Sequence, residues 1–439
     1  MTLALYSMLM RLLQPALRWK LRRRARAEPG YAVAVDERFG FYTQEAVMTD
    51  QRDQPPLRVW LHAVSLGETR AAAALVVQLR VALPGMTLLL THGTATGREH
   101  GKELLQEGDI QVWQPWDTPE AVCQFLAHFR PSVGLLMETE IWPNLVDQCQ
   151  RAKVPLCLVN ARLSEKSLRQ AQRLAWLARP AYQGLTAVWA QSQADADRLV
   201  QIGATVRGTL GNLKFDASPL VELVTTGQAW RAAVGRPIVV LANSRESEED
   251  MFLHILQRNR ATAPAGSAQA ATKNVATEVQ WMLVPRHPQR FDEVAQKCRD
   301  AGFSVSRRSG WNGVPGTADI LMGDSLGEMA AYYAMSDVTL MGGSFAALGG
   351  HNLIEATACD CPVVLGPHTF NFALASTLAE DAGAAQRAPD MQQAVEMAVA
   401  LVANASQLKQ ARQAAHAFSV AHQGAALRTA EAVRALLLG

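Results

Sequence analysis

Residues 58–82 read RVWLHAVSLGETRAAAALVVQLRVA, in which a short apolar run leads through a Ser-Leu-Gly-Glu turn into a helix-like stretch over 69–82. Continuous apolar runs bounded by turn residues are typical of parallel strands buried on both faces of a sheet. The same alternation recurs along the chain, with another helix-like stretch at 167–180. Repeated βα units predict a doubly wound α/β sheet.

The apolar runs fall into two sets, and each set predicts one parallel sheet. The first set is RVWLHAV (58–64), TLLLTHG (87–93), VGLLMET (133–139), PLCLVNA (155–161) and AVWAQS (187–192). The second set is PIVVLANS (237–244), WMLVPRH (281–287), DILMGD (319–324), VTLMGG (338–343) and PVVLG (362–366). The polar stretch 215–236 looks like the join. We therefore expect an N-terminal segment at 1–27, a first domain at 28–218 and a second at 219–439, which ends in an Ala-rich helix over 405–438.

Composition and cysteine usage exclude several classes of protein. With 49% hydrophobic and 19% charged residues, the chain is neither mostly disordered, nor a collagen-like fibre, nor a polytopic membrane protein. Six cysteines without a CxxC pair form no disulfide framework and indicate a reduced, cytoplasmic setting. A formal net charge of +2 argues against a nucleic-acid partner.

The motifs of several common enzyme classes are missing from the sequence. GxxxxGK[ST], GxGxxG and GxSxG do not occur, which disfavours a Walker-type nucleotide site, a dinucleotide dehydrogenase and a nucleophile-elbow hydrolase. Neither HExxH nor a cluster of Cys and His suggests a metal, so we expect no metal and no cofactor. The low-complexity stretch 261–278 is interpreted as a solvent loop.

Basic residues are concentrated at the N-terminus. Residues 1–27 carry seven basic side chains and no acidic one, and they begin with the mostly apolar run MTLALYSMLMRLLQPALRW. A membrane span needs about 20 apolar residues, and Arg11 and Pro15 interrupt this run. A signal peptide would place its basic residues first. The segment predicts attachment to an anionic membrane surface on its cytoplasmic face, by spanning or by lying in the interface; a helix packed on its own domain is the alternative.

Charged side chains follow predicted strands of the first domain, where a cleft between two doubly wound domains would bind ligands. Glu68 is either a general base for a hydroxyl nucleophile or an ordinary helix-start acid stabilised by the helix dipole. Glu138 and Glu140 follow a buried run, as site residues or as solvated loop acids. Lys214, in GNLKFD, is either an anion partner or a surface lysine with a buried stem.

The second domain offers candidate anion-binding residues at its strand ends. In Pro285-Arg286-His287-Pro288 the two prolines stiffen a turn around an arginine suited to phosphate or carboxylate, whereas a lone histidine is more often structural. Glycine pairs at 342–343 and 349–350 allow backbone N–H groups to face a phosphate, or simply form turns. Glu355, one turn into the helix that follows, is a candidate acceptor for ribose hydroxyls.

These motifs occur together in one known family. In order, the sequence contains LYSMLMRLLQP, ERFGFY, HAVSLGE, METEIWPN, NARLSEKS, GNLKFD, PRHPQRF, GDSLGEM, GGSFAALGGHNLIEA and GPHTFNF. The chain resembles the 3-deoxy-D-manno-octulosonic acid (Kdo) transferases of Gram-negative bacteria almost from end to end. Each motif alone is weak evidence, whereas their shared order and spacing is very specific.

The resemblance implies a glycosyltransferase-B fold, with two Rossmann-like domains facing a central cleft and an N-terminal membrane-anchoring helix. It implies an inverting, metal-independent enzyme of lipopolysaccharide synthesis at the cytoplasmic face of the inner membrane. The enzyme would move one or more Kdo residues from CMP-Kdo to the 6′ hydroxyl of the lipid A precursor (lipid IVA). By motif, Glu68 matches the catalytic base, and Glu138 and Lys214 match residues that stabilise the transition state. The residues that match the CMP site are Arg286, His287, Leu326, Gly327, Glu328, Asn352, Leu353, Ile354 and Glu355.

Two departures from the family's usual pattern concern the second domain. Arg245, in ANSRESEED (242–250), replaces a histidine, which could alter contacts with the donor, and 261–278 looks like an insertion.

The rival enzyme is a lipid-linked hexose transferase or an epimerase of the same fold, which a donor competition assay would separate. The rival from another class is a membrane-bound scaffold without activity, which an absence of CMP binding would support.

Overall fold

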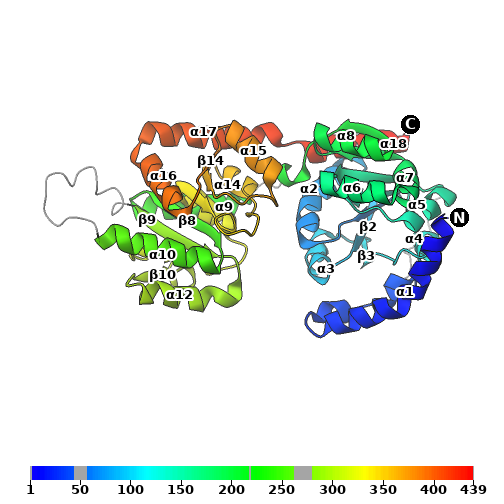
Figure 1. Cartoon of the computed structure of the whole chain (residues 1–439), viewed down its shortest axis with the longest axis horizontal. Helices are drawn as coiled ribbons and strands as arrows, with labels where there is room; N and C mark the ends of the chain where they lie inside the picture. Colours follow the sequence, from blue (N-terminus) through cyan, green and yellow to red (C-terminus); the bar gives the residue numbers. More distant parts are fainter. Residues whose placement is uncertain (1, 44–56, 217–218, 262–278, 439) are drawn as a thin grey trace. The chain divides into compact units, whose positions relative to one another are not determined.

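The computed structural model describes residues 2–43, 57–216, 219–261 and 279–438. The chain divides into two compact units, the first made of Met1–Ala217 with His422–Gly439 and the second of Ser218–Ala421 (Figure 1). The polypeptide therefore passes between the units twice, and the first unit contains both ends of the chain.

Within the described residues, the first unit holds a seven-stranded parallel sheet in the order β3-β2-β1-β4-β5-β6-β7. Its strands are β1 (Arg58–His62), β2 (Thr87–His92), β3 (Ile110–Trp113), β4 (Val133–Met137), β5 (Leu156–Ala161), β6 (Ala187–Ala190) and β7 (Val206–Thr209). Its α-helices are α1 (Thr2–Ala25), α2 (Leu66–Ala82), α3 (Ala95–Gly101), α4 (Pro119–Phe129), α5 (Pro143–Arg151), α6 (Glu165–Arg173), α7 (Ala175–Gln183), α8 (Gln193–Ile202) and α18 (Ala425–Leu438). Its 3₁₀ helices are η1 (Pro29–Ala32), η2 (Val35–Phe39), η3 (Lys102–Leu104) and η4 (Leu213–Asp216).

Short polar side chains start the helices that follow the strands of this unit. Ser65, Thr118 and Ser192 precede α2, α4 and α8, and each side chain accepts a backbone N–H from three residues further on. Such N-caps satisfy a donor that the helix itself leaves unpaired. The central strands β1, β4 and β5 are buried along their whole length. A buried strand followed by a capped helix is thus the unit that repeats.

Helices cover both faces of the first sheet. One face packs against α4, α5, α7 and α8, and here the rings of Trp60 and Phe125 lie 4.8 Å apart between centroids. The other face packs against α2 and against α18, which comes from the far end of the chain (Figure 1). Removal of this apolar surface from water is the main stabilising contribution to the unit.

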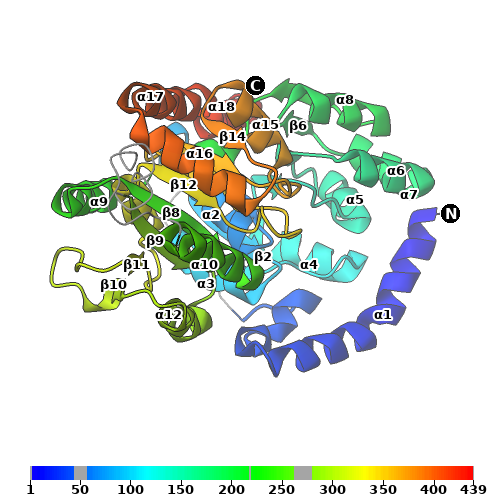
Figure 2. The same ribbon diagram turned by 60° about the vertical axis from the view of Figure 1, so that its left-hand side comes forward.

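The second unit repeats the architecture, with a described seven-stranded parallel sheet in the order β10-β11-β9-β8-β12-β13-β14. Its strands are β8 (Ile238–Ser244), β9 (Gln280–Pro285), β10 (Val305–Arg307), β11 (Ile320–Met322), β12 (Val338–Met341), β13 (Val363–Leu365) and β14 (Ala385–Arg387). Its helices are α9 (Val221–Val234), α10 (Glu246–Ala261), η6 (Pro288–Arg290), α12 (Phe291–Asp300), η7 (Arg308–Gly310), α13 (Met329–Met335), α14 (Ile354–Thr357), α15 (Ala373–Asp381), α16 (Met391–Ala403) and α17 (Ala405–His422). Helices α10, α12 and α16 cover one face of this sheet (Figure 2).

The prediction of two Rossmann-like parallel sheets is confirmed, and each predicted apolar run contains a strand. The strands that the runs do not reveal in the described chain are β3, β7, β10 and β14, which are the edge strands of the two sheets. An edge strand pairs on one side only and is often short or polar, as VRGT (206–209) and AQR (385–387) are. Apolar runs therefore predict the buried centre of each sheet and miss its borders.

The C-terminal end differs from the predicted domain boundary. The sequence predicts a second domain that reaches 439, whereas residues from His422 onward belong to the first unit. The predicted helix over 405–438 is interrupted at Gly424, whose φ of 92° lies in the left-handed region that glycine tolerates. The side chain of Asp216 then accepts the backbone N–H groups of Gly424 and Ala426. The predicted boundary is wrong here because the apolar face of an Ala-rich helix does not indicate which of the two sheets the helix covers.

Helix α1 forms over the N-terminal segment and continues through Pro15. It contacts its own unit through the hydroxyl of Tyr6, which donates to Asp117 (2.9 Å), and the hydroxyl of Ser7, which donates to Asn144 (2.6 Å). Across the described parts of the chain, no helix combines the length and apolarity that crossing a bilayer requires. The same helix exposes Leu5, Met8, Leu9, Leu12 and Trp19.

Candidate active site

In each unit the strand order changes direction beside one central strand. In the first sheet this point separates β1 from β4, and the turns after these strands carry Glu68 and Glu138. In the second sheet it separates β8 from β12, whose turns carry Arg245 and the pair Gly342–Gly343. Ligands of doubly wound sheets bind at such points, outside the carboxyl ends of the strands. Each unit therefore presents one candidate binding region of its own.

Glu68 lies in the first turn of α2 and is held by the turn that precedes it. Its Oε2 accepts the backbone N–H of Val64 (2.9 Å), and its Oε1 accepts the hydroxyl of Ser65 (3.2 Å). Burial, with a further contribution from the carboxylates of Glu138 and Glu140, raises the pKa of Glu68 to about 7, although its hydrogen bonds favour the charged form. A carboxyl group with a pKa near neutrality is suited to exchange a proton with a ligand.

Glu138 follows β4 and sits between two cations. Its Oε1 lies 2.9 Å from Nζ of Lys214, and its Oε2 lies 3.6 Å from Nε of Arg162. The backbone of Glu138 has a φ of 55°, in the left-handed region that side chains other than glycine rarely adopt and that is enriched at functional sites. The fold thus joins Glu138 and Lys214, which are 76 residues apart in sequence, in one ion pair.

Glu140 completes the acidic group of the first unit. Its Oε2 accepts the indole N–H of Trp142 (3.1 Å). Burial raises the pKa of Glu140, and the charge of Glu138 adds to the effect. The sequence leaves the two acids after β4 open between a site and a solvated loop; the structure makes both of them partly buried and electrostatically coupled to Glu68.

Cationic and imidazole side chains gather at the strand ends of the second unit. Arg286, after β9, donates its backbone N–H to the carbonyl of Ser244 at the end of β8 (3.1 Å), while its exposed side chain makes no hydrogen bond or ion pair with the described residues. Burial, then the charges of Arg286 and Arg245, lowers the pKa of His351 to about 4. The same causes lower the pKa of His287. Both imidazoles are therefore neutral at pH 7, and the positive charge of the group lies on its two arginines.

The first glycine pair does not offer its N–H groups to a phosphate. Glu248, fully buried in the first turn of α10, accepts the N–H groups of Gly343 (2.7 Å), Phe345 (3.0 Å) and Ala346 (3.2 Å). The N–H of Gly350 donates to the carbonyl of Gly343 (2.8 Å). The alternative of a structural turn therefore holds for this loop. Glu248 is not among the predicted site residues, although the acids of ESEED (246–250), three of them in the first turn of α10, are a usable signal.

The other residues that match the CMP site differ in what they can offer a ligand. Leu326 and Gly327 are exposed, whereas Glu328 pairs with Arg308 (2.8 Å). Asn352 donates its side-chain N–H to Glu355 (3.2 Å). Leu353 and Ile354 are buried in the core, so only their backbone groups are available for a contact. The helix that follows them, α14, is a single short turn.

Comparison with known proteins decides the family. Residues 34–217, which include Glu68, Glu138 and Lys214, match the family model described as 3-deoxy-D-manno-octulosonic-acid transferase (kdotransferase). Over 98% of its length the chain is 44% identical to the 3-deoxy-D-manno-octulosonic acid transferase of Bordetella pertussis, and it covers 98% of that protein. The chain belongs to the Kdo transferase family. The Kdo transferase of Haemophilus influenzae is 32% identical over 78% of the chain and 77% of that protein.

As a Kdo transferase, the chain is a glycosyltransferase, and its fold agrees with this class. A crystal structure of a glycosyltransferase from Rickettsia africae matches with a TM-score of 0.54 over 88% of the chain and 99% of that structure, at 11% sequence identity. At such an identity the likeness shows the fold alone. Membership of the Kdo transferase family confirms the resemblance seen in the motifs and sets aside the hexose transferase, the epimerase and the inactive scaffold.

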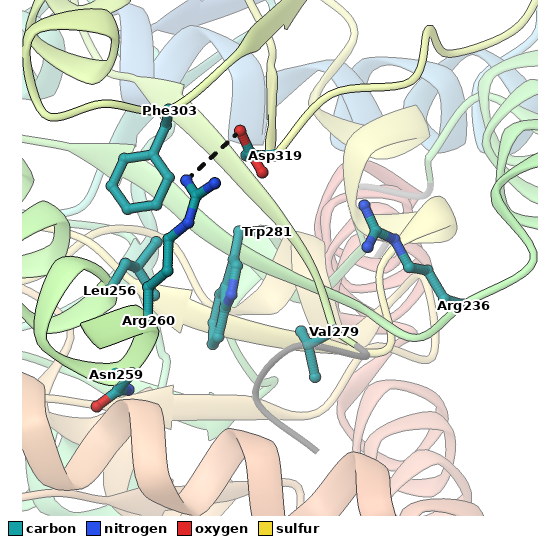
Figure 3. A pocket seen from close by; sticks show the side chains of 8 residues that line it. All are labelled: Arg236, Leu256, Asn259, Arg260, Val279, Trp281, Phe303 and Asp319. Atoms are coloured by element: carbon teal, nitrogen blue, oxygen red, sulfur yellow. Dashed lines mark ion pairs between the residues drawn. The ribbon is translucent and has the colours of Figure 1, made fainter. Parts of the chain in front are cut away.

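A cavity in the second unit of this Kdo transferase lies away from these residues (Figure 3). Arg236, Val279 and Trp281 line it from the amino ends of β8 and β9, opposite to the end that carries Arg286. Arg260 points toward Asp319 across the cavity. Because its charged groups are paired within the wall, we do not place the candidate site here. In the described ranges, no group of three or more His, Cys, Asp or Glu side chains is arranged to hold a metal ion.

Proposed function

We propose that this Kdo transferase moves Kdo from CMP-Kdo to the 6′ hydroxyl of the lipid A precursor lipid IVA, with inversion, in lipopolysaccharide synthesis. The observation that carries the proposal is Glu68, a hydrogen-bonded carboxyl group at the switch point of its sheet with a pKa of about 7. A hydroxyl acceptor is a poor nucleophile until it loses its proton. A base whose pKa lies near the working pH both accepts and releases that proton readily.

In the proposed reaction Glu68 takes the proton of the acceptor hydroxyl. The oxygen of that hydroxyl forms a bond to the anomeric carbon of Kdo, while the bond between this carbon and the phosphate oxygen of CMP breaks. CMP leaves with the electron pair of the broken bond. A single displacement from the opposite face inverts the configuration at the anomeric carbon.

Lys214 is assigned to the stabilisation of negative charge during the transfer. Its Nζ is fixed 2.9 Å from Glu138, and 27% of its side chain remains exposed and therefore accessible to a ligand. A cation that is already oriented stabilises a developing charge without reorganisation at the moment of reaction. In this scheme Glu138 orients the lysine and Arg162 balances the second oxygen of Glu138.

Arg286 and Arg245 are proposed to bind the anionic donor, which carries a phosphate and a sugar carboxylate. Arg286 has no internal partner among the described residues, and Arg245 has only the exposed Glu246 at 3.5 Å. A bound anion would relieve the repulsion between two guanidinium groups and supply bidentate partners for them. The family motifs add Leu326–Glu328 and Asn352–Glu355 as contacts for CMP, and the arginines take the part that a metal plays in other nucleotide sites.

Mass spectrometry of lipid IVA incubated with the purified protein and CMP-Kdo in detergent tests the proposal. We expect a mass gain of one or more Kdo units, and their number follows from the same spectrum. The matched pair of variants is Glu68→Gln, which should abolish the gain, and Glu165→Gln, an exposed acid in the first turn of α6, which should retain it. No gain with the unchanged protein, beside an active Kdo transferase as control, would refute the assignment of donor and acceptor.

The N-terminal helix is proposed to lie in an anionic membrane surface on the cytoplasmic face of the inner membrane. Its exposed apolar side chains recur three or four residues apart, so they form one stripe along the helix. Exposed basic residues follow at Lys20, Arg22, Arg23 and Arg26. A helix of this kind buries its apolar stripe at the lipid boundary, and each basic residue near anionic lipids adds about 1 kcal/mol.

Sedimentation with vesicles that contain anionic lipid tests this location. We expect Leu9→Ser combined with Leu12→Ser to lose most vesicle binding. The matched control is Val77→Ser combined with Val81→Ser, which removes two equally exposed apolar side chains from α2. Equal binding of both double variants would show that another surface attaches the protein.

A further inference from the structure

We infer that Asn160 is a positioning residue that fixes Lys214 against Glu138 for the transfer reaction. The inference rests on the role proposed for Lys214 and adds a residue that neither the motifs nor the comparisons assign. Asn160 lies near the end of β5, is 2% exposed and touches none of the groups proposed to react. Its action is therefore indirect.

The side chain of Asn160 holds the segment that carries Lys214. Its Oδ1 accepts the backbone N–H of Leu213 (3.0 Å), the first residue of η4, and Lys214 is the next residue. The backbone carbonyl of Asn160 accepts the side-chain N–H of Gln191 (2.9 Å), which fixes the strand end itself. The lysine backbone is thus tied to a buried strand through the residue before it, while its own N–H donates to Oδ1 of Asn212 (3.0 Å).

The partner of the lysine is attached to the same strand end. The backbone N–H of Glu138 donates to the carbonyl of Val159 (3.1 Å), and the N–H of Arg162 donates to the carbonyl of Glu138 (3.3 Å). The register between β5 and β6 shifts between Leu158 and Ala161, an irregularity of the kind that redirects side chains beside active sites. Two residues at the end of β5, Val159 and Asn160, and Arg162 just after it therefore hold both halves of the ion pair.

The local conformation and the unused donor of Asn160 both point to selection for this purpose. Its φ of 51° lies in the left-handed region, where asparagine is among the best tolerated residues after glycine. Its buried Nδ2 has no hydrogen-bond partner in the described structure, which costs stability. Aspartate would supply the same acceptor without an orphan donor, but it would place another carboxylate beside Glu138 to compete for the lysine. Asparagine combines the acceptor, tolerance of this backbone conformation and zero charge.

The reactivity of the Lys214 amine tests the inference without any assay of transfer. Variants Asn160→Gly, which keeps the left-handed backbone, and Glu138→Gln, which removes the ion-pair partner, are acetylated in parallel with the unchanged protein. We expect acetylation of Lys214, measured by peptide mass spectrometry, to accelerate roughly 2- to 10-fold in both variants. The exposed Lys166 and Lys409 serve as internal controls and should not change. Acceleration in Glu138→Gln without any in Asn160→Gly would overturn the inference.

Kinetics then separate a positioning role from general damage to the fold. With thermal unfolding matched to the unchanged protein, Asn160→Gly should lower kcat about 10- to 100-fold and leave the KM for the donor nearly unchanged. Asn160→Asp should retain the bond to Leu213 yet shift the acid limb of the pH–rate profile to higher pH, because it adds a negative charge near Glu138. A normal kcat for Asn160→Gly would also overturn the inference. Failure of the unchanged protein to transfer Kdo would instead refute the proposed function, while the labelling result would still stand.

Discussion

The two units treat the charges at their strand ends in opposite ways. In the first unit, Glu138 is bracketed by Lys214 and Arg162, so opposite charges meet within the protein. In the second unit, Arg245 and Arg286 lie close enough to lower the pKa of their neighbouring histidines. A paired charge is preorganised for a reaction, whereas two like charges without comparable partners are prepared for an anion that arrives with the substrate.

The difference arises from where the carboxylates of each unit find their donors. In the second unit Glu248 is satisfied by backbone N–H groups, and Glu249 forms two hydrogen bonds with Arg290 (2.9 and 2.7 Å). These acids are buried and support the fold, so neither is available to neutralise Arg286. In the first unit the acids after β4 remain at the strand end. Under the proposed mechanism, the same sheet topology therefore serves proton transfer in one unit and anion binding in the other.

The largest expected effect concerns Glu68, a strand-end acid of the first unit whose carboxylate accepts the N–H of Val64 and the hydroxyl of Ser65. Glu68→Gln should keep the shape of the side chain and lower kcat by roughly 10²- to 10⁴-fold, because it removes the base. Binding of CMP-Kdo, measured by calorimetry, should change little. Near-normal turnover would contradict the comparison of the two units, since Glu68 would then not be the proton acceptor of the first unit.

Removal of Glu248 should have the next largest effect, and it is an effect on stability. Glu248→Ala leaves buried N–H groups of the glycine loop without an acceptor, which should cost roughly 3–5 kcal/mol of the free energy of unfolding. For a unit of this size the Tm should fall by about 6–20 °C in calorimetry. The control is Glu246→Ala, on the same helix turn but exposed, which should change the Tm only slightly. Similar losses in both variants would show that the carboxylate of Glu248 does not support the glycine loop.

Removal of an unpaired cation should weaken donor binding and spare the fold. Arg286→Ala should raise the KM for CMP-Kdo about 10- to 100-fold, as expected for loss of a charge-assisted hydrogen bond, with an unchanged Tm. Arg299→Ala, which removes an exposed arginine from α12, is the matched control and should leave the KM unchanged. If Arg286→Ala lowered the Tm instead of the affinity for the donor, Arg286 would support the fold. The contrast between paired charges in the first unit and an anion-binding arginine in the second would then be wrong.

The smallest expected effect is a change in pH dependence. With a pKa of about 7 for Glu68, kcat/KM should rise with pH through that value, because the base must lose its proton before it can accept one from the acceptor. Glu140→Gln removes a negative charge that raises the pKa of Glu68, so the midpoint of the profile should move to lower pH. Movement in the other direction would show that a different group titrates.

Much of the fold could be predicted from the sequence, because the central strands are continuous apolar runs such as TLLLTH and VGLLM. Edge strands lack this signal, since solvent on one side permits polar residues such as those of VSR (305–307). The position of α18 was beyond prediction for a different reason. Its apolar face fits a sheet, and only the tertiary fold decides that the sheet belongs to the unit made by the start of the chain.

The candidate site was predictable as a set of strand-end residues but not as a set of contacts. The position of Glu68 and Glu138 after buried strands marks them as candidates, whereas the pairing of Glu138 with Lys214 depends on a separation of 76 residues that no local pattern encodes. Glycines offer the converse case. The pair at 342–343 has the composition of a phosphate loop, yet the backbone N–H of Gly343 already donates to the buried Glu248 of α10.

Helix α18 also determines the order in which this protein can be completed during synthesis. The second unit is continuous in sequence, whereas the first unit lacks α18 until the residues that follow the second unit have been translated. At 5–20 residues per second, the intervening residues take roughly 10–40 s to translate. During that interval Leu75 and Leu79 of α2 are not yet covered by α18. In the finished fold they share a buried cluster with Ala430 and Val433. The nascent chain should therefore expose an apolar surface to chaperones on its first unit, which is translated first, after the second unit has been synthesised.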